Sequence, residues 1–201
     1  DDLSRGLGDV YKRQGRPGPV VVDIPKDITE QKCKFEYPNE VNIRSYQPYV
    51  DIEDNKIKEI IDAIKVSKKP IIYSGGGVIT SNASNELTEF TKLLGYPITN
   101  TLMGLGAYPG NDKQFIQMLG MHGSYEANIA MHDCDLMIAI GARFDDRITG
   151  RLDMFSPNSK KIHIDIDPSS ISKNIRVDIS VIGDVKKVLS FLIDQMNVDG
   201  I

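Results

Sequence analysis

Cysteine is scarce in this sequence, which has only two, Cys33 and Cys134, among its 201 residues. They are isolated from one another and form no CxxC pair, which argues against a disulfide framework or a zinc site. The reduced cytoplasm is therefore the expected compartment. The three histidines, His122, His132 and His163, show neither HExxH spacing nor a nearby cysteine partner. The sequence therefore predicts no metal site.

Long apolar runs and an excess of basic charge are also missing. No stretch approaches the ~20 apolar residues that a membrane-spanning helix requires, and the N-terminus holds no apolar signal core. The 24 lysines and arginines are outnumbered by 28 aspartates and glutamates, whereas nucleic-acid-binding proteins carry a basic face. We therefore expect a soluble protein that binds neither membranes nor nucleic acid.

The common catalytic motifs are absent as well. The sequence has no GxSxG elbow, no GxxxxGK(S/T) phosphate-binding loop and no GxGxxG dinucleotide fingerprint. No catalytic residue can therefore be nominated from these motifs. The missing fingerprint also weakens a Rossmann dehydrogenase as an interpretation.

From residue 51 onward, helical and strand patterns alternate. Apolar residues at helical spacing predict helices over 53–67, 83–94 and 184–196, and two short helices are expected within 112–132. Short apolar runs predict strands at 70–74, 96–100, 136–140, 161–166 and 181–182. Strands that are apolar along their whole length are buried on both faces, so this alternation predicts an α/β fold. We expect a doubly wound parallel sheet with helices on both sides.

The first fifty residues have a different texture. Residues 1–14 show no sustained periodicity and are expected to be poorly ordered. The run Pro-Val-Val-Val-Asp-Ile at 19–24 predicts a short buried strand, which needs a sheet to join. Residues 31–50 are polar, contain two prolines and are typical of a linker between domains.

In a doubly wound sheet, ligands bind beyond the carboxyl ends of the strands, near the reversal of strand order. Three glycines at 75–77 follow a predicted strand and let the backbone approach a pyrophosphate, although a flexible turn is an equally good interpretation. The loop Gly-Ala-Arg-Phe-Asp-Asp-Arg at 141–147 offers arginines for phosphate oxygens and aspartates for ribose hydroxyls. A surface cluster of salt bridges is the alternative for this loop.

Two further candidates lie at predicted strand ends. Asp165 is spaced from Gly141 as an acidic residue that accepts from a ribose hydroxyl would be, although a solvated strand-end aspartate is the simpler interpretation. The stretches 101–106 and 119–123 interleave small residues with methionines, which offers a surface for a flat ring. Ordinary core packing is the simpler interpretation there. The loops together predict a cofactor-binding α/β domain with no visible catalytic residues.

Several of these segments resemble the large subunits of acetolactate synthases, which are thiamine-diphosphate enzymes. GRPGPV at 15–20 and VDIPKD at 22–27 resemble the end of the N-terminal domain in that family. The central segments follow in family order and are TLMGLG at 101–106, LGMHG at 119–123, GARFDDRITG at 141–150, IHIDID at 162–167 and GDV at 183–185. The resemblance covers residues 15 to about 196.

The resemblance implies a domain organisation and a cofactor. Residues 15–50 would be the end of an N-terminal pyrimidine-binding domain plus a linker, and 51–201 a six-stranded central domain that holds FAD. Residues 1–14 do not match the family, and we expect them to be disordered or foreign to it. The implied FAD contacts are Arg16, Gly76, Thr101, Leu102, Leu119, Gly120, Met121, His122, Gly141, Ala142, Arg143, Phe144, Asp145, Asp146, Asp165, Ile166, Asp184 and Val185. The implied lining of a substrate and inhibitor channel is Lys26, Met121, Asp146 and Arg147.

The resemblance also implies an activity, the thiamine-diphosphate-dependent condensation of pyruvate with a second 2-oxo acid such as 2-oxobutanoate in branched-chain amino acid synthesis. The family's activating glutamate and its Mg²⁺-binding GDG…N motif belong to domains that this chain does not contain, so we expect no acetolactate from the chain alone. The implied assembly is a homodimer or homotetramer with a regulatory small subunit. The alternatives are a stand-alone nucleotide- or FAD-binding module and the central domain of a glyoxylate carboligase or pyruvate oxidase.

Overall fold

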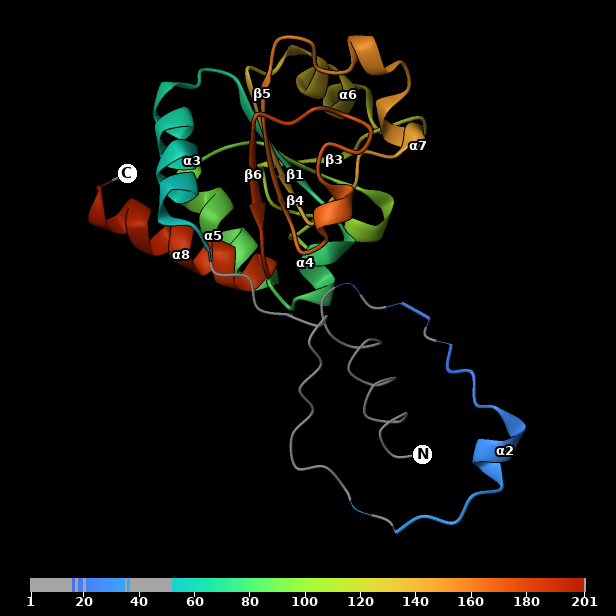
Figure 1. Ribbon diagram of the computed structural model, residues 1–201. Coiled ribbons are helices and arrows are strands. Elements are labelled where there is room, and N and C mark those ends of the chain that lie inside the picture. Colours follow the sequence, from blue (N-terminus) through green and yellow to red (C-terminus); the bar gives the residue numbers. More distant parts are fainter. Residues whose placement is uncertain (1–15, 17, 20, 35, 37–51, 201) are drawn as a thin grey trace. The chain divides into compact units, whose positions relative to one another are not determined.

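The chain divides into two compact units, residues 1–50 and 51–201. The computed structural model describes residues 16, 18–19, 21–34, 36 and 52–200 (Figure 1). The expectations for residues 1–14 and for most of the 31–50 linker therefore lie outside the described residues. In the first unit, Lys26–Thr29 form the short helix α2.

The described residues of the strand expected at 19–24, which are 19 and 21–24, do not form a strand. The described residues of this run have no regular structure and are exposed, Val21 by 91% of its surface. A strand obtains its backbone hydrogen bonds from neighbouring strands, and the described part of the first unit contains no other strand. The prediction identified an apolar segment correctly but was wrong about its conformation in this chain.

The second unit is built on a six-stranded sheet in which all neighbouring strands are parallel. The strands are β1 (Pro70–Ser74), β2 (Ile98–Asn100), β3 (Phe115–Met118), β4 (Leu136–Ile140), β5 (Lys160–Asp165) and β6 (Ile179–Ile182). Their order is β3-β2-β1-β4-β5-β6. The predicted doubly wound α/β fold is therefore confirmed, and the strand order reverses between β1 and β4.

A continuous row of isoleucines explains the register of the sheet. Ile98, Ile72, Ile138, Ile162 and Ile179 stand opposite one another in that order across five strands. All five are buried in one core cluster. Burying each such side chain stabilises the fold by roughly 1.5–3 kcal/mol, and a shift of one residue would turn the row to the other face of the sheet.

Helices cover both faces of the sheet (Figure 1). The isoleucine row packs against α3 (Asp54–Val66), α5 (Ser84–Leu94) and α8 (Val185–Val198). Gly95 ends α5 with a left-handed φ of 70°. The opposite face carries a smaller cluster around α6 (Tyr125–Asp133), which includes Met137 and Phe144.

One of the two helices expected within 112–132 is a strand instead. The second expected helix is α6, but residues 115–118 form β3 at the edge of the sheet. There β3 pairs with β2, and the hydroxyl of Thr99 donates to the carbonyl of Gln117 at 2.7 Å. Pairing with a neighbouring strand overrides a weak local pattern in so short a segment.

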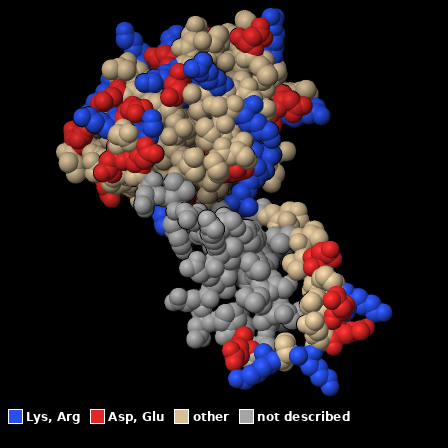
Figure 2. Space-filling model, in the orientation of Figure 1, with Lys and Arg blue, Asp and Glu red and all other residues tan. Residues whose placement is uncertain are grey.

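The remaining elements are short. They are α4 (Gly76–Thr80), α7 (Asp146–Thr149), η1 (Leu102–Gly104), η2 (Leu152–Met154) and η3 (Pro168–Ser170). Basic and acidic side chains are interspersed over the visible face of the second unit (Figure 2). None of the helices among the described residues combines the length and the apolarity that crossing a membrane demands.

Candidate functional site

The carboxyl ends of all six strands lie at one edge of the sheet, because the strands are parallel. Every cofactor residue predicted within the second unit lies at this edge, here called the carboxyl edge. By strand these residues are Gly76 after β1, Thr101 and Leu102 after β2, 119–122 after β3, 141–146 after β4, Asp165 and Ile166 at the end of β5, and Asp184 and Val185 after β6. Arg16 and Lys26 belong to the first unit, where both are exposed.

At the reversal of strand order, two glycines pack against the loop that follows β4. The N–H of Gly75 donates to the carbonyl of Ile140 and the N–H of Gly77 to that of Gly141, each at 3.0 Å. A Cβ on Gly75 would lie 2.3 Å from the Gly141 carbonyl oxygen. These glycines therefore permit contact between two loops, and they also form the turn from β1 into the helix Gly76–Thr80.

The loop 141–146 is held through three successive carbonyl groups. His163 Nε2 lies 2.9 Å from the carbonyl oxygen of Ala142, the hydroxyl of Tyr73 donates to that of Arg143 at 3.4 Å, and Asn174 Nδ2 donates to that of Phe144 at 2.7 Å. By contrast, the N–H groups of residues 142–146 have no hydrogen-bond acceptor among the described residues. The loop thus presents unpaired donors, which suit an anionic ligand.

Aromatic packing in the core also fixes the loop 141–146, through the ring of Phe144. The Phe144 ring lies 5.2 Å from the ring of His163 at an interplanar angle of 71° and 5.9 Å from that of Tyr73. Phe144 is buried in the smaller core cluster. Phe144 was predicted to contact the cofactor. Because its side chain is in the core, only its backbone is available at the carboxyl edge. Leu119, Ala142 and Val185 are likewise buried through their side chains.

The charged side chains of the loop 141–147 are exposed or partly exposed to solvent. Arg143 and Asp145 form an ion pair at 2.9 Å with about half of each side chain exposed. This contact fits the alternative of a surface salt bridge, which contributes little to stability. Asp146 and Arg147 are also exposed.

Two of the simpler interpretations are contradicted, one for Asp165 and one for the apolar residues that follow β2 and β3. Asp165 is only 8% exposed and accepts from the N–H of Asp167 at 2.9 Å, so it is not a solvated strand-end aspartate. Leu102, Met103 and Met121 are 67%, 75% and 67% exposed, so they are not core residues. The carboxyl edge therefore combines a buried carboxylate with an apolar surface.

The loop after β3 is tied to the loop after β4. The N–H of Met121 donates to the carbonyl of Arg147 at 3.2 Å. Gly120 has a φ of 99°, and a Cβ there would meet the same carbonyl oxygen at 2.8 Å. The predicted stretches 119–122 and 141–147 are thus brought together, as a shared site requires.

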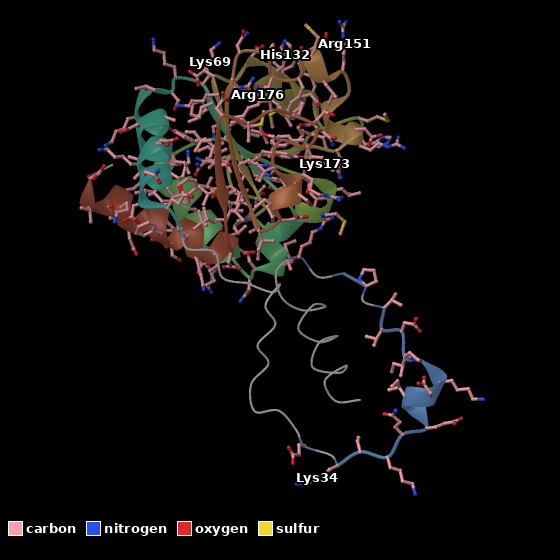
Figure 3. The ribbon with its side chains drawn as sticks, viewed as in Figure 1. Lys34, Lys69, His132, Arg151, Lys173 and Arg176 are labelled. Atoms are coloured by element: carbon pink, nitrogen blue, oxygen red, sulfur yellow. The ribbon has the colours of Figure 1, made fainter. Side chains whose placement is uncertain are left out.

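Other predicted positions have structural tasks. Asp184 caps α8, since its side chain accepts from the N–H of Lys187 at 3.1 Å. Thr101 caps η1 through its hydroxyl, which accepts from the N–H of Gly104 at 3.0 Å. Sequence reasoning missed Tyr73 and Asn174, which hold the 141–146 loop. Asn174 lies between η3 and β6, a segment in which Figure 3 labels Lys173 and Arg176.

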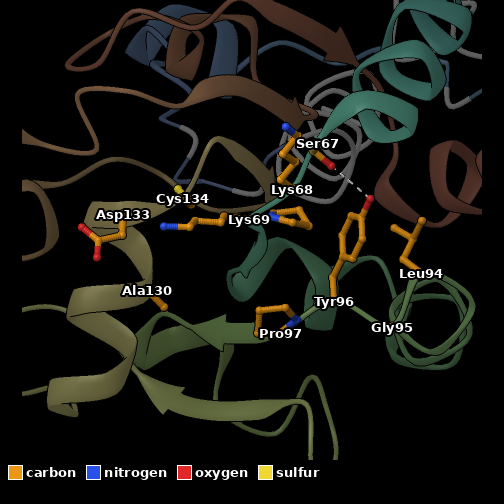
Figure 4. A pocket seen from close by; sticks show the side chains of 11 residues that line it. Ser67, Lys68, Lys69, Leu94, Gly95, Tyr96, Pro97, Ala130, Asp133 and Cys134 are labelled. Atoms are coloured by element: carbon orange, nitrogen blue, oxygen red, sulfur yellow. Dashed lines mark hydrogen bonds between the residues drawn. The ribbon is translucent and has the colours of Figure 1, made fainter.

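A pocket of about 530 Å³ lies at the opposite, amino edge of the sheet (Figure 4). Lys68, Lys69, Tyr96, Asp133 and Cys134 are among its lining residues, and they precede β1, β2 and β4. None of the predicted cofactor residues lines this pocket. The sequence-based site and the pocket are therefore at different ends of the sheet.

Comparison with known proteins bears on both the family and the fold. Residues 57–192 match the family described as thiamine pyrophosphate enzyme, central domain. The chain is 53% identical to the acetolactate synthase large subunit of Haemophilus influenzae over 93% of its own length and 33% of that protein. It is 45% identical to the acetolactate synthase isozyme 3 large subunit of Escherichia coli over 91% of its length and 32% of that protein. The chain thus spans about a third of the length of these relatives.

Among solved structures, the chain is similar to a thiamin diphosphate-dependent enzyme isolated from Mycobacterium smegmatis. The TM-score is 0.71 at 22% identity, over 96% of this chain and 37% of that one. This likeness supports the fold alone. The family match covers 57–192, which includes all six strands and most of α3 and α8. The chain therefore belongs to the thiamine pyrophosphate enzymes, of which it contains the central domain.

Proposed function

We propose that the chain is part of an acetolactate synthase large subunit and supplies the cofactor-holding central domain of that enzyme. The observation that carries the proposal is the 53% identity to the Haemophilus influenzae large subunit over 93% of the chain. The alternative, the central domain of another thiamine-diphosphate enzyme, has no comparable support, because the likeness to the Mycobacterium smegmatis enzyme at 22% identity supports the fold alone.

We propose that FAD is the ligand of the carboxyl edge. The unpaired N–H groups of 142–146 and the Arg143 side chain suit its phosphate groups. The buried carboxylate of Asp165 suits a ribose hydroxyl, and the exposed Leu102 and Met121 suit a flat ring. When bound, FAD would undergo no net redox change, so the task of these residues is to bind and orient it.

The proposal extends to the other expected FAD contacts. In the second unit these are Gly76, Thr101, Leu119, Gly120, His122, Gly141, Ala142, Phe144, Asp145, Asp146, Ile166, Asp184 and Val185. Arg16 is the remaining FAD contact that the family resemblance implies. Lys26, Met121, Asp146 and Arg147 would line the substrate channel. Residues 15–50 would then be the end of the pyrimidine-binding domain and the linker, with 1–14 unrelated to either.

The whole enzyme would condense pyruvate with 2-oxobutanoate or a second pyruvate in branched-chain amino acid synthesis. Thiamine diphosphate would stabilise the carbanion left by decarboxylation. It would be held with Mg²⁺ by parts of the longer enzyme that this chain does not span. We place the enzyme in the cytoplasm, as a homodimer or homotetramer with a regulatory small subunit.

A chimera tests this function directly. Residues 52–200 would replace the matching segment of the Haemophilus influenzae large subunit, and acetolactate formation from pyruvate would be measured. We expect an active chimera, whereas a control chimera with the matching segment of the Mycobacterium smegmatis enzyme should be inactive. A folded chimera that binds FAD but forms no acetolactate would contradict the proposal.

A further inference from the structure

In the backbone of residues 142–145, the carbonyl groups form hydrogen bonds within the described part of the chain but the N–H groups do not. Its three carbonyl groups at 142–144 each meet a side-chain donor, while the N–H groups that follow them have no acceptor among the described residues. In a planar trans peptide, the C=O of one residue and the N–H of the next point in opposite directions. Fixing the three carbonyls therefore directs the N–H groups of 143–145 away from the three donors.

The donors come from separate parts of the fold. Tyr73 lies on β1, His163 on β5 and Asn174 in the segment between η3 and β6. The side chains of Tyr73 and His163 are fully buried on the face of the sheet that carries the smaller core cluster. Strands β1 and β5 both pair with β4, from which the loop emerges. The loop is therefore held from both of its neighbouring strands.

Tyr73 and His163 each present a hydrogen-bond donor to a carbonyl group of the loop. Burial raises the pKa of Tyr73 well above its usual value, and the negative charge of Asp145 adds to this effect. The phenol therefore keeps its proton. Because a carbonyl only accepts, Nε2 of His163 must carry the hydrogen toward Ala142. Its Nδ1 is buried with no partner among the described residues, so the ring contacts this loop through Nε2.

We infer that Tyr73, His163 and Asn174 are positioning residues that orient the N–H groups of 143–145 toward the phosphate groups of a bound dinucleotide. The inference rests on the proposed FAD site and names the side chains that organise it without touching the cofactor. Orienting donors before the ligand arrives reduces the ordering cost of binding. The loss of any one of these donors should therefore weaken FAD binding.

The first test compares Tyr73→Phe with Tyr96→Phe in the 201-residue chain. Tyr96 is a matched control, since its hydroxyl also donates to a backbone carbonyl, that of Ile64 at 3.2 Å, but at the amino edge. The dissociation constant for FAD would be measured by flavin fluorescence. We expect Tyr73→Phe to weaken binding about three- to tenfold, as the loss of one hydrogen bond implies, and Tyr96→Phe to leave it within twofold.

The second test uses rescue at His163. His163→Phe keeps an aromatic ring against Phe144 but removes the donor to Ala142, so we expect weaker FAD binding. His163→Gln places an amide N–H at a similar reach and should restore most of the affinity. A role in packing alone would give the opposite order, because the phenylalanine ring preserves the packing better than glutamine does.

The third test pairs Asn174→Ala with Gln114→Ala. Gln114 donates to the carbonyls of Thr91 and Tyr96 at 2.8 Å, far from the carboxyl edge. We expect Asn174→Ala to weaken FAD binding about three- to tenfold and to speed amide hydrogen exchange in 142–146. Gln114→Ala should do neither.

The outcomes separate the inference from the proposal beneath it. If the unchanged chain binds no FAD, the proposed cofactor and the inference fall together. If it binds FAD and the Tyr73, His163 and Asn174 variants, shown to be folded by circular dichroism, bind it within twofold of the unchanged chain, the inference alone is overturned. Should His163→Phe not fold, the Tyr73 and Asn174 pairs still decide the matter.

Discussion

Gly141 combines a left-handed backbone with close contact to the loop after β1. Its φ is +56°, and an added Cβ would lie 2.8 Å from the Cα of Gly77. Both the left-handed backbone and the close approach of the two loops therefore require glycine. The family resemblance implies Gly141 only as an FAD contact, and the structure shows that it also permits contact between the loops after β1 and β4.

We predict that Gly141→Ala lowers the free energy of unfolding by about 2 kcal/mol or more, through backbone strain and displaced neighbours. Gly110→Ala is the control, because no atom lies within 4 Å of a Cβ built there, and it should stay within about 0.5 kcal/mol. Urea unfolding measures both variants. Equal stability of the two would contradict this account of the loop contact.

Lys161 is a buried cation near the start of β5. Its ammonium donates to the carbonyls of Ser156 and Ser159 at 2.8 and 3.0 Å. Burial lowers the pKa of Lys161, and the nearby Asp178 carboxylate only partly opposes this effect. The folded state therefore releases this proton more readily than the unfolded state does.

This lowered pKa predicts a pH dependence with a definite sign. Between the lowered folded pKa and the ordinary lysine value of about 10.4, the unfolded state binds more protons, so stability rises with pH. The unfolding free energy of the unchanged chain minus that of Lys161→Met should therefore grow as the pH approaches that value. A difference that is flat or falling between pH 7 and 10, measured by urea unfolding, would contradict the burial argument.

At the scale of elements, the hydrophobic pattern of the sequence predicted the three long helices correctly, because in them local pattern and tertiary packing agree. Helices α3, α5 and α8 carry apolar residues at helical spacing, and Gly95 and Asp184 mark two of their ends. Strand β3 was missed because its partner β2, rather than its own four residues, determines its conformation. The run at 19–24 failed for the converse reason, since an apolar pattern makes no strand where the described residues of the first unit offer no sheet to join.

The cap of α8 gives a prediction at this scale. Asp184→Ala removes the acceptor for the N–H of Lys187 and should lower the free energy of unfolding by about 1 kcal/mol. Asp194 is exposed within the same helix and forms no hydrogen bond or ion pair with the described residues. Asp194→Ala should therefore be neutral or slightly stabilising. A loss of stability as large for Asp194→Ala as for Asp184→Ala in thermal unfolding would show that the cap is not the cause.

At the scale of the whole molecule, the parallel sheet explains which parts of the candidate site could be predicted from the sequence. The loops at 101–106, 119–123 and 141–147 were identifiable from their residues, and a parallel sheet necessarily brings them to one edge. The donors Tyr73 and Asn174 were not identifiable, since they reach the 141–146 loop from 70 and 30 residues away. Such contacts depend on strand register and loop paths, which local pattern does not encode.

The share of the enzyme that this chain spans gives a further prediction for the whole molecule. It covers about a third of its acetolactate synthase relatives and matches the central domain of the family. We therefore expect the purified chain, supplied with pyruvate, FAD, thiamine diphosphate and Mg²⁺, to form no acetolactate. A colorimetric assay for acetolactate tests this, and turnover that scales with the concentration of the chain would refute it.

Hydrogen exchange with and without FAD tests the central claim most directly, because the two edges of the sheet offer different sites. Protection from exchange reports where a ligand orders the backbone. We predict that FAD protects residues 101–106, 119–123 and 141–147 at the carboxyl edge and leaves residues 67–70 and 94–97 around the amino-edge pocket unchanged. Protection confined to the amino-edge pocket, or no protection in the presence of saturating FAD, would contradict the account.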